Sequence, residues 1–261
     1  MRYHKMLIVA LTIPILSQAA AQTIETVVDI PTRPGVTQRM ILLMPRDPKA
    51  AVVLFAGDDG GLEILSNGSI LRRDQNFLVR SRQLFAQQGL VVAVIDAPSD
   101  RQTPPFLRHF RRTPEHAADI KAVISWLRET VKVPVWLVGT SRGTVSVAYA
   151  AIELNGPEGP DGIVLSSTIL KQEGRAVPEM PLERIRVPVL VVHHERDGCK
   201  VCSFADIPTL MAKLQDAPQS RLLSFTGGIG VGDPCRSTSN HGYYGIEAEV
   251  VQQTAAWLLD R

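Results

Sequence analysis

The sequence has no long apolar segment beyond its first twenty residues, and it has no internal repeat or low-complexity tract. A membrane-spanning helix needs about 20 consecutive apolar residues, so we expect none in the rest of the chain. The 261 residues are 45% hydrophobic and 21% charged, as in an ordinary globular protein. A chain of this length suits one large α/β domain better than two small ones.

The chain also has little net charge. It contains 28 basic and 26 acidic residues, but two of the basic residues, Arg2 and Lys5, lie in a segment that we expect to be removed. The 26 basic residues that remain balance the 26 acidic ones. This balance gives no indication of a nucleic-acid partner or of electrostatic binding to a membrane surface.

The segment that we expect to be removed is residues 1–21. It has a basic start, an apolar run at 6–16 and small residues at Ala19 and Ala21. This is the layout of a secretory signal peptide, so the expected mature domain is residues 22–261 and the expected location is the periplasm or the extracellular space. An uncleaved membrane anchor is the alternative, although the apolar run is short for a membrane span.

Short apolar runs rich in β-branched residues alternate with amphipathic segments from residue 50 onward. We expect strands at 50–55, 90–95, 133–138, 162–165, 187–193 and 221–225, and helices at 76–88, 113–131, 144–152, 206–214 and 245–259. Two further strand-like segments, 23–30 and 37–44, are separated by a turn with proline and glycine and predict an antiparallel hairpin. The alternation predicts an α/β fold with a mostly parallel sheet covered by helices on both faces.

The strand expected at 133–138 leads into Gly139-Thr140-Ser141-Arg142-Gly143, which matches the pattern G-x-S-x-G, and then into a helix of small and apolar residues. In a sharp turn from strand to helix, such a serine hydroxyl is raised above the sheet and the first helical N–H groups point at a bound carbonyl oxygen. The two glycines leave room where the backbone doubles back. The motif predicts that Ser141 is a nucleophile; the alternative is an ordinary strand–helix turn.

A serine nucleophile needs a base that is itself held in orientation. His241 lies in a polar loop between the last strand and the last helix, which suits an imidazole at the sheet edge, so we predict that it is the base. Asp197 follows the strand at 187–193 and is the predicted carboxylate partner. Glu195 and Asp233 are the alternatives for that carboxylate.

The order Ser141, Asp197, His241, with each residue placed after a strand, resembles that of the α/β-hydrolase superfamily. The resemblance covers about residues 37–261, and the small, lidless members similar to dienelactone hydrolases are nearest in length. It implies a single domain without a large cap domain, because only about twenty residues, 168–187, connect two of the expected strands. Dienelactone hydrolases use a cysteine nucleophile, so their substrate is not carried over to this serine.

The resemblance also implies an oxyanion hole made of two backbone N–H groups. One should come from Arg142, which follows the nucleophile, and the other from the loop after the strand at 50–55. That loop, Ala56-Gly57-Asp58-Asp59-Gly60-Gly61, lacks the His-Gly of many family members, and Asp58 is its expected donor. Its acidic side chains should point away from a developing oxyanion or be paired, for example with Arg142.

Asp59 and Arg108 are candidate substrate-binding residues. Asp58 or Asp59 could contact hydroxyl or amine groups of a substrate, whereas Arg108 belongs to an arginine-containing loop at 97–112 that would favour an acidic substrate if it faced the cleft. The alternatives are two turn aspartates in solvent and a solvated run of arginines.

The chain has only three cysteines, Cys199, Cys202 and Cys235. An exported protein is expected to form a disulfide. We favour Cys199–Cys235, which would tie the loop of Asp197 to the loop that leads to His241; Cys202–Cys235 and Cys199–Cys202 stay open. Three cysteines without a well-spaced fourth ligand do not predict a zinc site.

Together these residues predict an exported serine hydrolase that cleaves a small-molecule ester through an acyl-enzyme intermediate, without a metal or an organic cofactor. A peptidase or amidase with the same triad is one alternative. A non-catalytic binding protein that kept the fold is another, because the His-Gly of many family members is absent. We expect no nucleic-acid partner and, after signal cleavage, no insertion into a membrane.

Overall fold

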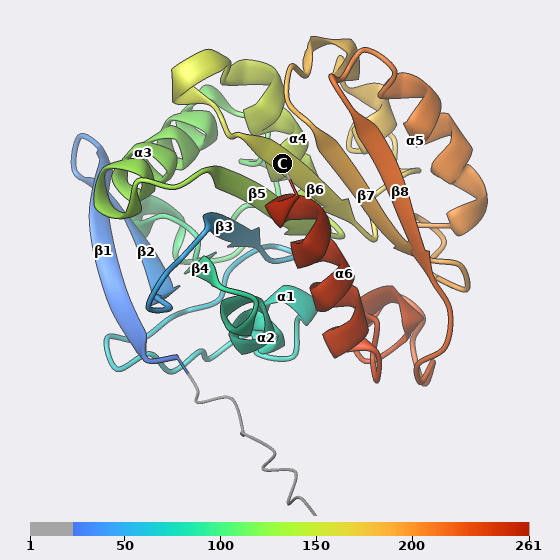
Figure 1. Cartoon of the computed structure of the whole chain (residues 1–261), viewed down its shortest axis with the longest axis horizontal. Helices are drawn as coiled ribbons and strands as arrows, with labels where there is room; N and C mark the ends of the chain where they lie inside the picture. The colour runs from blue at the N-terminus through green and yellow to red at the C-terminus, as the bar shows by residue number, and fades with distance from the viewer. Residues whose placement is uncertain (1–22, 261) are drawn as a thin grey trace, which may run out of the picture.

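The computed structural model describes residues 23–260, so the expected signal peptide lies outside the described residues. Within that range eight strands form one sheet in the order β1-β2-β4-β3-β5-β6-β7-β8 (Figure 1). The strands are β1 (Glu25–Arg33), β2 (Val36–Leu43), β3 (Ala50–Phe55), β4 (Leu90–Ile95), β5 (Val135–Thr140), β6 (Gly162–Ser166), β7 (Val189–His194) and β8 (Ser220–Phe225).

Helices cover both faces of this sheet. The hydrophobic residues of α3 (Pro114–Val131), α4 (Gly143–Glu153) and α5 (Ile207–Lys213) join the core on one face. Those of α1 (Phe77–Arg80), α2 (Arg82–Gln87) and α6 (Glu247–Leu259) join the core on the other face, where Figure 1 shows α6 in front of the strands. Short 3-10 helices lie in the loops: η1 (Ser99–Arg101), η2 (Gly156–Glu158), η3 (Val177–Glu179), η4 (Leu182–Arg184), η5 (Phe204–Asp206) and η6 (Asn240–Gly242).

The strand directions confirm the predicted sheet. β1 and β2 form an antiparallel hairpin and β2 runs antiparallel to β4, whereas all other neighbouring strands are parallel. Every residue of β3, β4 and β5 is buried, as expected for strands with helices on both sides. Between β6 and β7 the chain forms only η3 and η4, so this connection contains no cap domain.

Most expected elements differ from the observed ones by one to three residues at an end, for example 23–30 against Glu25–Arg33 for β1. The helix expected at 76–88 is two short helices, because the N–H of Ser81 donates to Phe77 and Val79 and ends α1, after which α2 begins. The central strand extends two residues further than expected, since Gly139 and Thr140 still pair with β6. Ser141 therefore follows the last strand residue directly.

A buried carboxylate organises the loop that follows β3. Asp96, at the end of β4, is 1% exposed. It accepts hydrogen bonds from the backbone N–H groups of Leu62 at 2.7 Å, Ile64 at 2.9 Å and Ala97 at 2.7 Å. A carboxylate with several N–H donors compensates for its burial. Asp96 thereby joins the loops after β3 and β4 at the carboxyl edge of the sheet, where ligands of such sheets bind.

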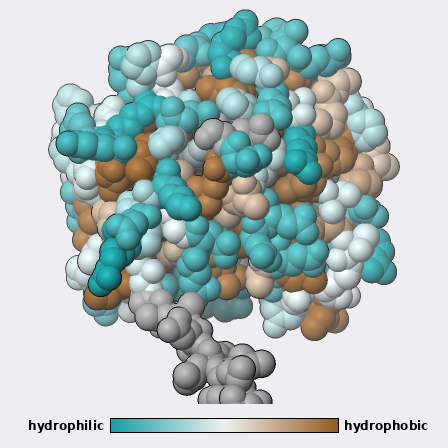
Figure 2. Space-filling view, viewed as in Figure 1, coloured by the Kyte–Doolittle hydropathy of each residue, from teal (hydrophilic) through white to brown (hydrophobic). Residues whose placement is uncertain are grey.

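The exposed apolar surface is divided among several places. Within residues 23–260, no helix has the length and the apolar character needed to cross a membrane. In Figure 2 the hydrophobic residues of the visible face form separate areas between hydrophilic ones. The large hydrophobic side chains with the greatest exposure come from different segments: Ile24, Met44, Leu65, Leu71, Ile229, Val231 and Tyr244.

Candidate active site

Ser141 occupies a strained turn between β5 and α4. Its φ is 52°, in the left-handed region that residues with a Cβ rarely adopt outside functional turns. The two glycines of the motif permit the turn: a Cβ on Gly143 would lie 2.1 Å from the carbonyl oxygen of Phe55, and one on Gly139 would lie 2.6 Å from the carbonyl carbon of Gly143. Close backbone packing therefore requires glycine at both positions.

His241 and Asp197 form a buried hydrogen-bonded pair. Nδ1 of His241 donates to Oδ2 of Asp197 at 2.8 Å, and the two residues are 5% and 7% exposed. Oδ1 of Asp197 accepts the backbone N–H of Cys199 at 2.9 Å. Because Nδ1 carries the proton, Nε2 of the neutral ring is left as a hydrogen-bond acceptor. This is the form that a general base needs.

The alternative carboxylates make other contacts. Glu195 is exposed and accepts a hydrogen bond from Oγ of Ser224 at 2.8 Å. Asp233 is exposed and accepts the backbone N–H of Cys235 at 2.9 Å. Of the three candidate carboxylates, all within the described residues, only Asp197 forms a hydrogen bond with His241.

Buried contacts hold the His241 loop in place. Oγ of Ser167 donates to the carbonyl of His241 at 2.8 Å, and Nη2 of Arg80 donates to the carbonyl of Gly242 at 2.6 Å. The hydroxyl of Tyr243, which is fully buried, donates to the carbonyl of Val192 at 2.9 Å. Sequence analysis missed these supports; a tyrosine in an otherwise polar loop was the one available signal.

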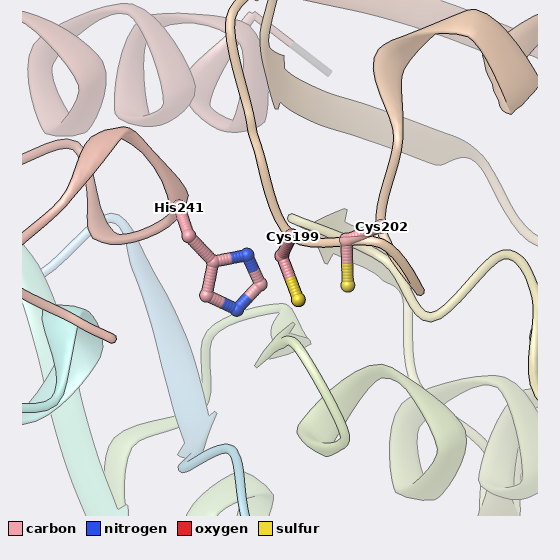
Figure 3. A group of neighbouring side chains, drawn as sticks. All are labelled: Cys199, Cys202 and His241. Carbon is pink, nitrogen blue, oxygen red and sulfur yellow. The ribbon is translucent and has the colours of Figure 1, made fainter. Parts of the chain in front are cut away.

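A disulfide ties this loop to the loop of Asp197. Cys199 is bonded to Cys235, the pairing favoured from the sequence, and Cys202 is a buried free thiol. Figure 3 shows Cys199, Cys202 and His241 next to one another, with their sulfur and ring nitrogen atoms within 4.8 Å. Since the sulfur of Cys199 is already bonded, this group lacks the second thiolate that a soft metal ion would need.

The thiol of Cys202 also lies close to the nucleophile. Burial, with the charge of Asp197 as a second cause, raises the pKa of Cys202 well above its usual value. The positive charge of Arg142 and, after it, a hydrogen bond with the hydroxyl of Ser141 partly offset that rise in pKa. Cys202 is therefore a neutral thiol near Ser141, and nothing in the sequence indicates that these two residues lie together.

A cavity of about 520 Å³ brings the candidate residues together, since Asp58, Ser141, Arg142 and His241 all line it. Within residues 23–260 the Ser141 hydroxyl and the His241 ring both line the cavity but form no hydrogen bond with each other. Such bonds are often long in the free protein and shorten when substrate binds. His241 and Ser141 line the cavity, whereas Asp197 does not and contacts only the side of the imidazole that carries Nδ1.

Two backbone N–H groups next to Ser141 are available to a ligand. The N–H groups of Asp58 and Arg142 donate to no residue between 23 and 260. The loop after β3 lies close to the nucleophile, because a Cβ on Gly57 would come within 3.0 Å of Cβ of Ser141. These are the two donors predicted for an oxyanion hole, and both residues line the same cavity.

The acidic side chains of this loop are paired with arginines. Arg73 contacts Asp58 at 2.6 Å and binds both oxygens of Asp59 at 2.8 and 2.9 Å, and Arg72 contacts Asp59 at 3.0 Å. Burial is the largest single influence on the pKa of Asp59 and would raise it, but the hydrogen bond and charge of Arg73, the N–H of Gly61 and the charge of Arg72 together hold that pKa below its usual value. The partners are thus Arg72 and Arg73 rather than Arg142. Asp59 is absent from the residues lining the cavity.

Arg111 binds the backbone of the same loop. It is 4% exposed, and Nη2 donates to the carbonyl oxygens of Ala56 at 3.0 Å and Asp58 at 3.3 Å, while Nη1 donates to Oγ of Ser146 at 2.8 Å. Burial lowers the pKa of Arg111 to about 10. Nothing in the sequence distinguishes Arg111 from the exposed arginines around it.

His116 belongs to this cluster and makes stability depend on pH. It is 1% exposed, Nε2 lies 2.9 Å from Oγ of Ser146, and burial followed by repulsion from Arg111 lowers its pKa to about 3. An unfolded histidine takes up a proton near pH 6.5, so only the unfolded chain is protonated between pH 6.5 and about 3. The free energy of unfolding should therefore fall as the pH drops below 6.5, by at most about 1.4 kcal/mol per pH unit from this group.

Urea unfolding at pH 7, 6 and 5 measures this dependence. We expect His116→Gln to lose less stability on acidification than the unchanged protein, and His109→Gln, at an exposed histidine, to behave as the unchanged protein. The same pH dependence in all three proteins would contradict the prediction.

No family model matches the sequence, and no curated protein matches it. Solved structures do: a dienelactone hydrolase from Anabaena variabilis is 17% identical, with 92% of this chain and 99% of that chain covered and a TM-score of 0.65. An esterase from Pyrococcus furiosus is 14% identical, with 90% and 91% covered and a TM-score of 0.63. A serine hydrolase without a lid from Xanthomonas campestris is 14% identical, with 89% and 95% covered and a TM-score of 0.56.

The protein has the α/β-hydrolase fold. The match extends over about nine tenths of the chain, as the resemblance of the motif order implied. At this level of identity the shared property is the fold. The chemistry of the α/β-hydrolase site in this chain has to be argued from its own residues.

Proposed function

We propose that the protein is a serine hydrolase that cleaves carboxylic esters with Ser141 as nucleophile, His241 as general base and Asp197 as the residue that orients the imidazole. The observation that carries this proposal is the 2.8 Å hydrogen bond between Asp197 and Nδ1 of His241, in a site whose cavity is also lined by the strained Ser141. The fold's solved relatives named above, a dienelactone hydrolase and an esterase, support the same class of reaction.

In the reaction that we propose, the Ser141 hydroxyl turns toward Nε2 of His241 and attacks the ester carbonyl. Nε2 takes the hydroxyl proton, and Asp197 stabilises the imidazolium that forms. The N–H groups of Asp58 and Arg142 donate to the oxyanion. Because Arg72 and Arg73 neutralise Asp58 and Asp59, no unpaired carboxylate opposes the negative charge.

Collapse of this intermediate breaks the bond to the alcohol, which leaves with the proton from Nε2. Water then attacks the acyl-enzyme, with His241 again as the base, and releases the acid and free Ser141. Every group in this sequence of steps belongs to the chain or to the substrate and water, and the proton returns to its starting point.

Labelling with a fluorophosphonate probe tests the proposal directly. We expect the protein to react at Ser141, Ser141→Ala to be unlabelled, and 4-nitrophenyl acetate to be hydrolysed by the unchanged protein but not by Ser141→Ala. Ser66→Ala is the matched control, because Ser66 is exposed and does not line the cavity. If Ser141 stays unlabelled in folded protein, the chain is a binding protein with this fold. Turnover of an aminoacyl 4-nitroanilide but not of esters would favour a peptidase or amidase.

We further propose that residues 1–21 are a signal peptide and that residues 22–261 act in the periplasm or outside the cell. The disulfide between Cys199 and Cys235 supports this, since such bonds persist in oxidising compartments. Mass spectrometry of the N-terminus tests the proposal. Protein isolated from its own source should begin at about residue 22.

A further inference from the structure

A second cavity, of about 400 Å³, adjoins the first one. Asp58 and Arg142 line both cavities, so the second begins beside the two N–H groups that we assign to the oxyanion hole. Its other lining residues are Val145 of α4 and residues of two segments, one between η1 and α3 and one between β6 and η3. These segments follow strands of the sheet at its carboxyl edge, where ligands of such sheets bind.

The charge of the second cavity is strongly one-sided. Its lining contains five arginines and one carboxylate, Asp58, which is already paired with Arg73. The arginines are Arg108, Arg111, Arg112, Arg142 and Arg175. With His109 neutral, the lining has a net charge of +4 before that pairing is considered.

Most of these guanidinium groups lack a counter-charge. The side chains of Arg108, Arg142 and Arg175 make no ion pair and no side-chain hydrogen bond with any residue in the described part of the chain. Arg112 donates only to the backbone carbonyl of Gly174, at 3.1 Å. Exposed arginines without partners are common on protein surfaces, so these residues alone would not indicate a ligand.

Arg111 is different because it is buried. No carboxylate lies within ion-pair distance of it in residues 23–260; its partners are two carbonyl oxygens and a hydroxyl, and its Nε–H has no acceptor there. A buried cation is costly without a counter-ion in contact with it, and Asp59 and Asp58 attract Arg111 only from beyond ion-pair distance, while Arg142 and Arg73 repel it. An anion in the second cavity would supply the missing negative charge.

We propose that the second cavity binds an anionic group, such as a carboxylate, that the ester substrate itself carries. This inference rests on the proposed function, since the ester carbonyl would lie at Ser141 while the charged end reaches past Arg142. Guanidinium groups bind such anions through charge-assisted and often bidentate hydrogen bonds. The enzyme should therefore prefer esters with a negative charge on the acid or on the alcohol part.

Two matched pairs of substrates test the preference. The acid side is tested with 4-nitrophenyl hemiglutarate against 4-nitrophenyl valerate, and the alcohol side with 4-acetoxybenzoate against its methyl ester. Within each pair the esters differ mainly in one negative charge. After subtraction of spontaneous hydrolysis, we expect kcat/KM for the anionic ester to exceed that for its neutral partner by about tenfold in one pair at low ionic strength, and this ratio to shrink in 0.5 M NaCl.

The double variant Arg108→Gln/Arg175→Gln tests whether the preference for anionic esters depends on the second cavity. Because neither side chain has an ion-pair or hydrogen-bond partner within residues 23–260, we expect the melting temperature to stay within a few degrees and the ratio to fall to about twofold or less. The double variant Arg46→Gln/Arg221→Gln removes the same charge at exposed residues outside both cavities and should keep the tenfold ratio.

The outcomes separate this inference from the proposed function. Equal kcat/KM values within both pairs, or a preference that survives in Arg108→Gln/Arg175→Gln, would overturn the inference and leave the esterase intact. Failure to hydrolyse any of the four esters, together with no fluorophosphonate labelling of Ser141, would instead remove the proposed function.

Discussion

Replacing Asp197 with asparagine is expected to lower kcat for ester hydrolysis by about 10⁴-fold, with the protein still folded. Oδ1 of Asp197 accepts the N–H of Cys199, so the carbonyl oxygen of an asparagine would take that place and its NH₂ group would face His241. The imidazole would then have to accept at Nδ1 and carry its proton on Nε2. In that tautomer Nε2 cannot take the proton of Ser141.

Steady-state kinetics on 4-nitrophenyl acetate, with circular dichroism to monitor folding, measures this effect. Glu195→Gln is the control, because Glu195 lies two residues from Asp197, is exposed and accepts a hydrogen bond from Ser224. We expect it to keep kcat/KM within about twofold. If Asp197→Asn keeps more than a tenth of the activity, Asp197 does not orient the base.

Replacing Gly143 with alanine is expected to destabilise the fold by about 3 kcal/mol or more. The new Cβ would lie 2.1 Å from the carbonyl oxygen of Phe55, an atom of the central sheet that cannot move without disturbing its neighbours. The comparison is Gly89→Ala: Gly89 has a φ of +80° but no atom within 4 Å of a Cβ, so only backbone strain of about 1–2 kcal/mol is expected.

Urea unfolding of both variants separates steric conflict from backbone strain. An insoluble Gly143→Ala beside a soluble Gly89→Ala would agree with the prediction. If Gly143→Ala unfolds at the same urea concentration as Gly89→Ala, the close packing of α4 on β3 does not limit stability.

Much of this architecture could be predicted from the sequence because its signals are local. The buried strands are short β-branched runs such as Ala50–Phe55, and the turn at Ser141 is marked by its own two glycines. Asp197 and His241 could be selected because each follows a strand, and parallel strands bring their carboxyl ends to one edge. Their hydrogen bond then follows from the topology of the sheet.

The residues that sequence analysis missed depend on contacts between distant segments. Arg111 is buried while Arg108 and Arg112 are exposed, and in an irregular loop no periodicity distinguishes the three. Similarly, the pairing of Asp58 with Arg73 depends on how the loop after β3 folds back. The contact between Cys202 and Ser141 joins loops after two different strands, and no spacing rule predicts it.

The disulfide between Cys199 and Cys235 bears on when the proposed hydrolase activity would appear. The bond links the segments that carry Asp197 and His241, and it can persist only where thiols are oxidised. In the reducing interior of the cell that makes it, a newly synthesised chain would lack this link, and its acid and base would be held less firmly. For the proposed function this means that full hydrolase activity is expected only after the chain has reached an oxidising compartment.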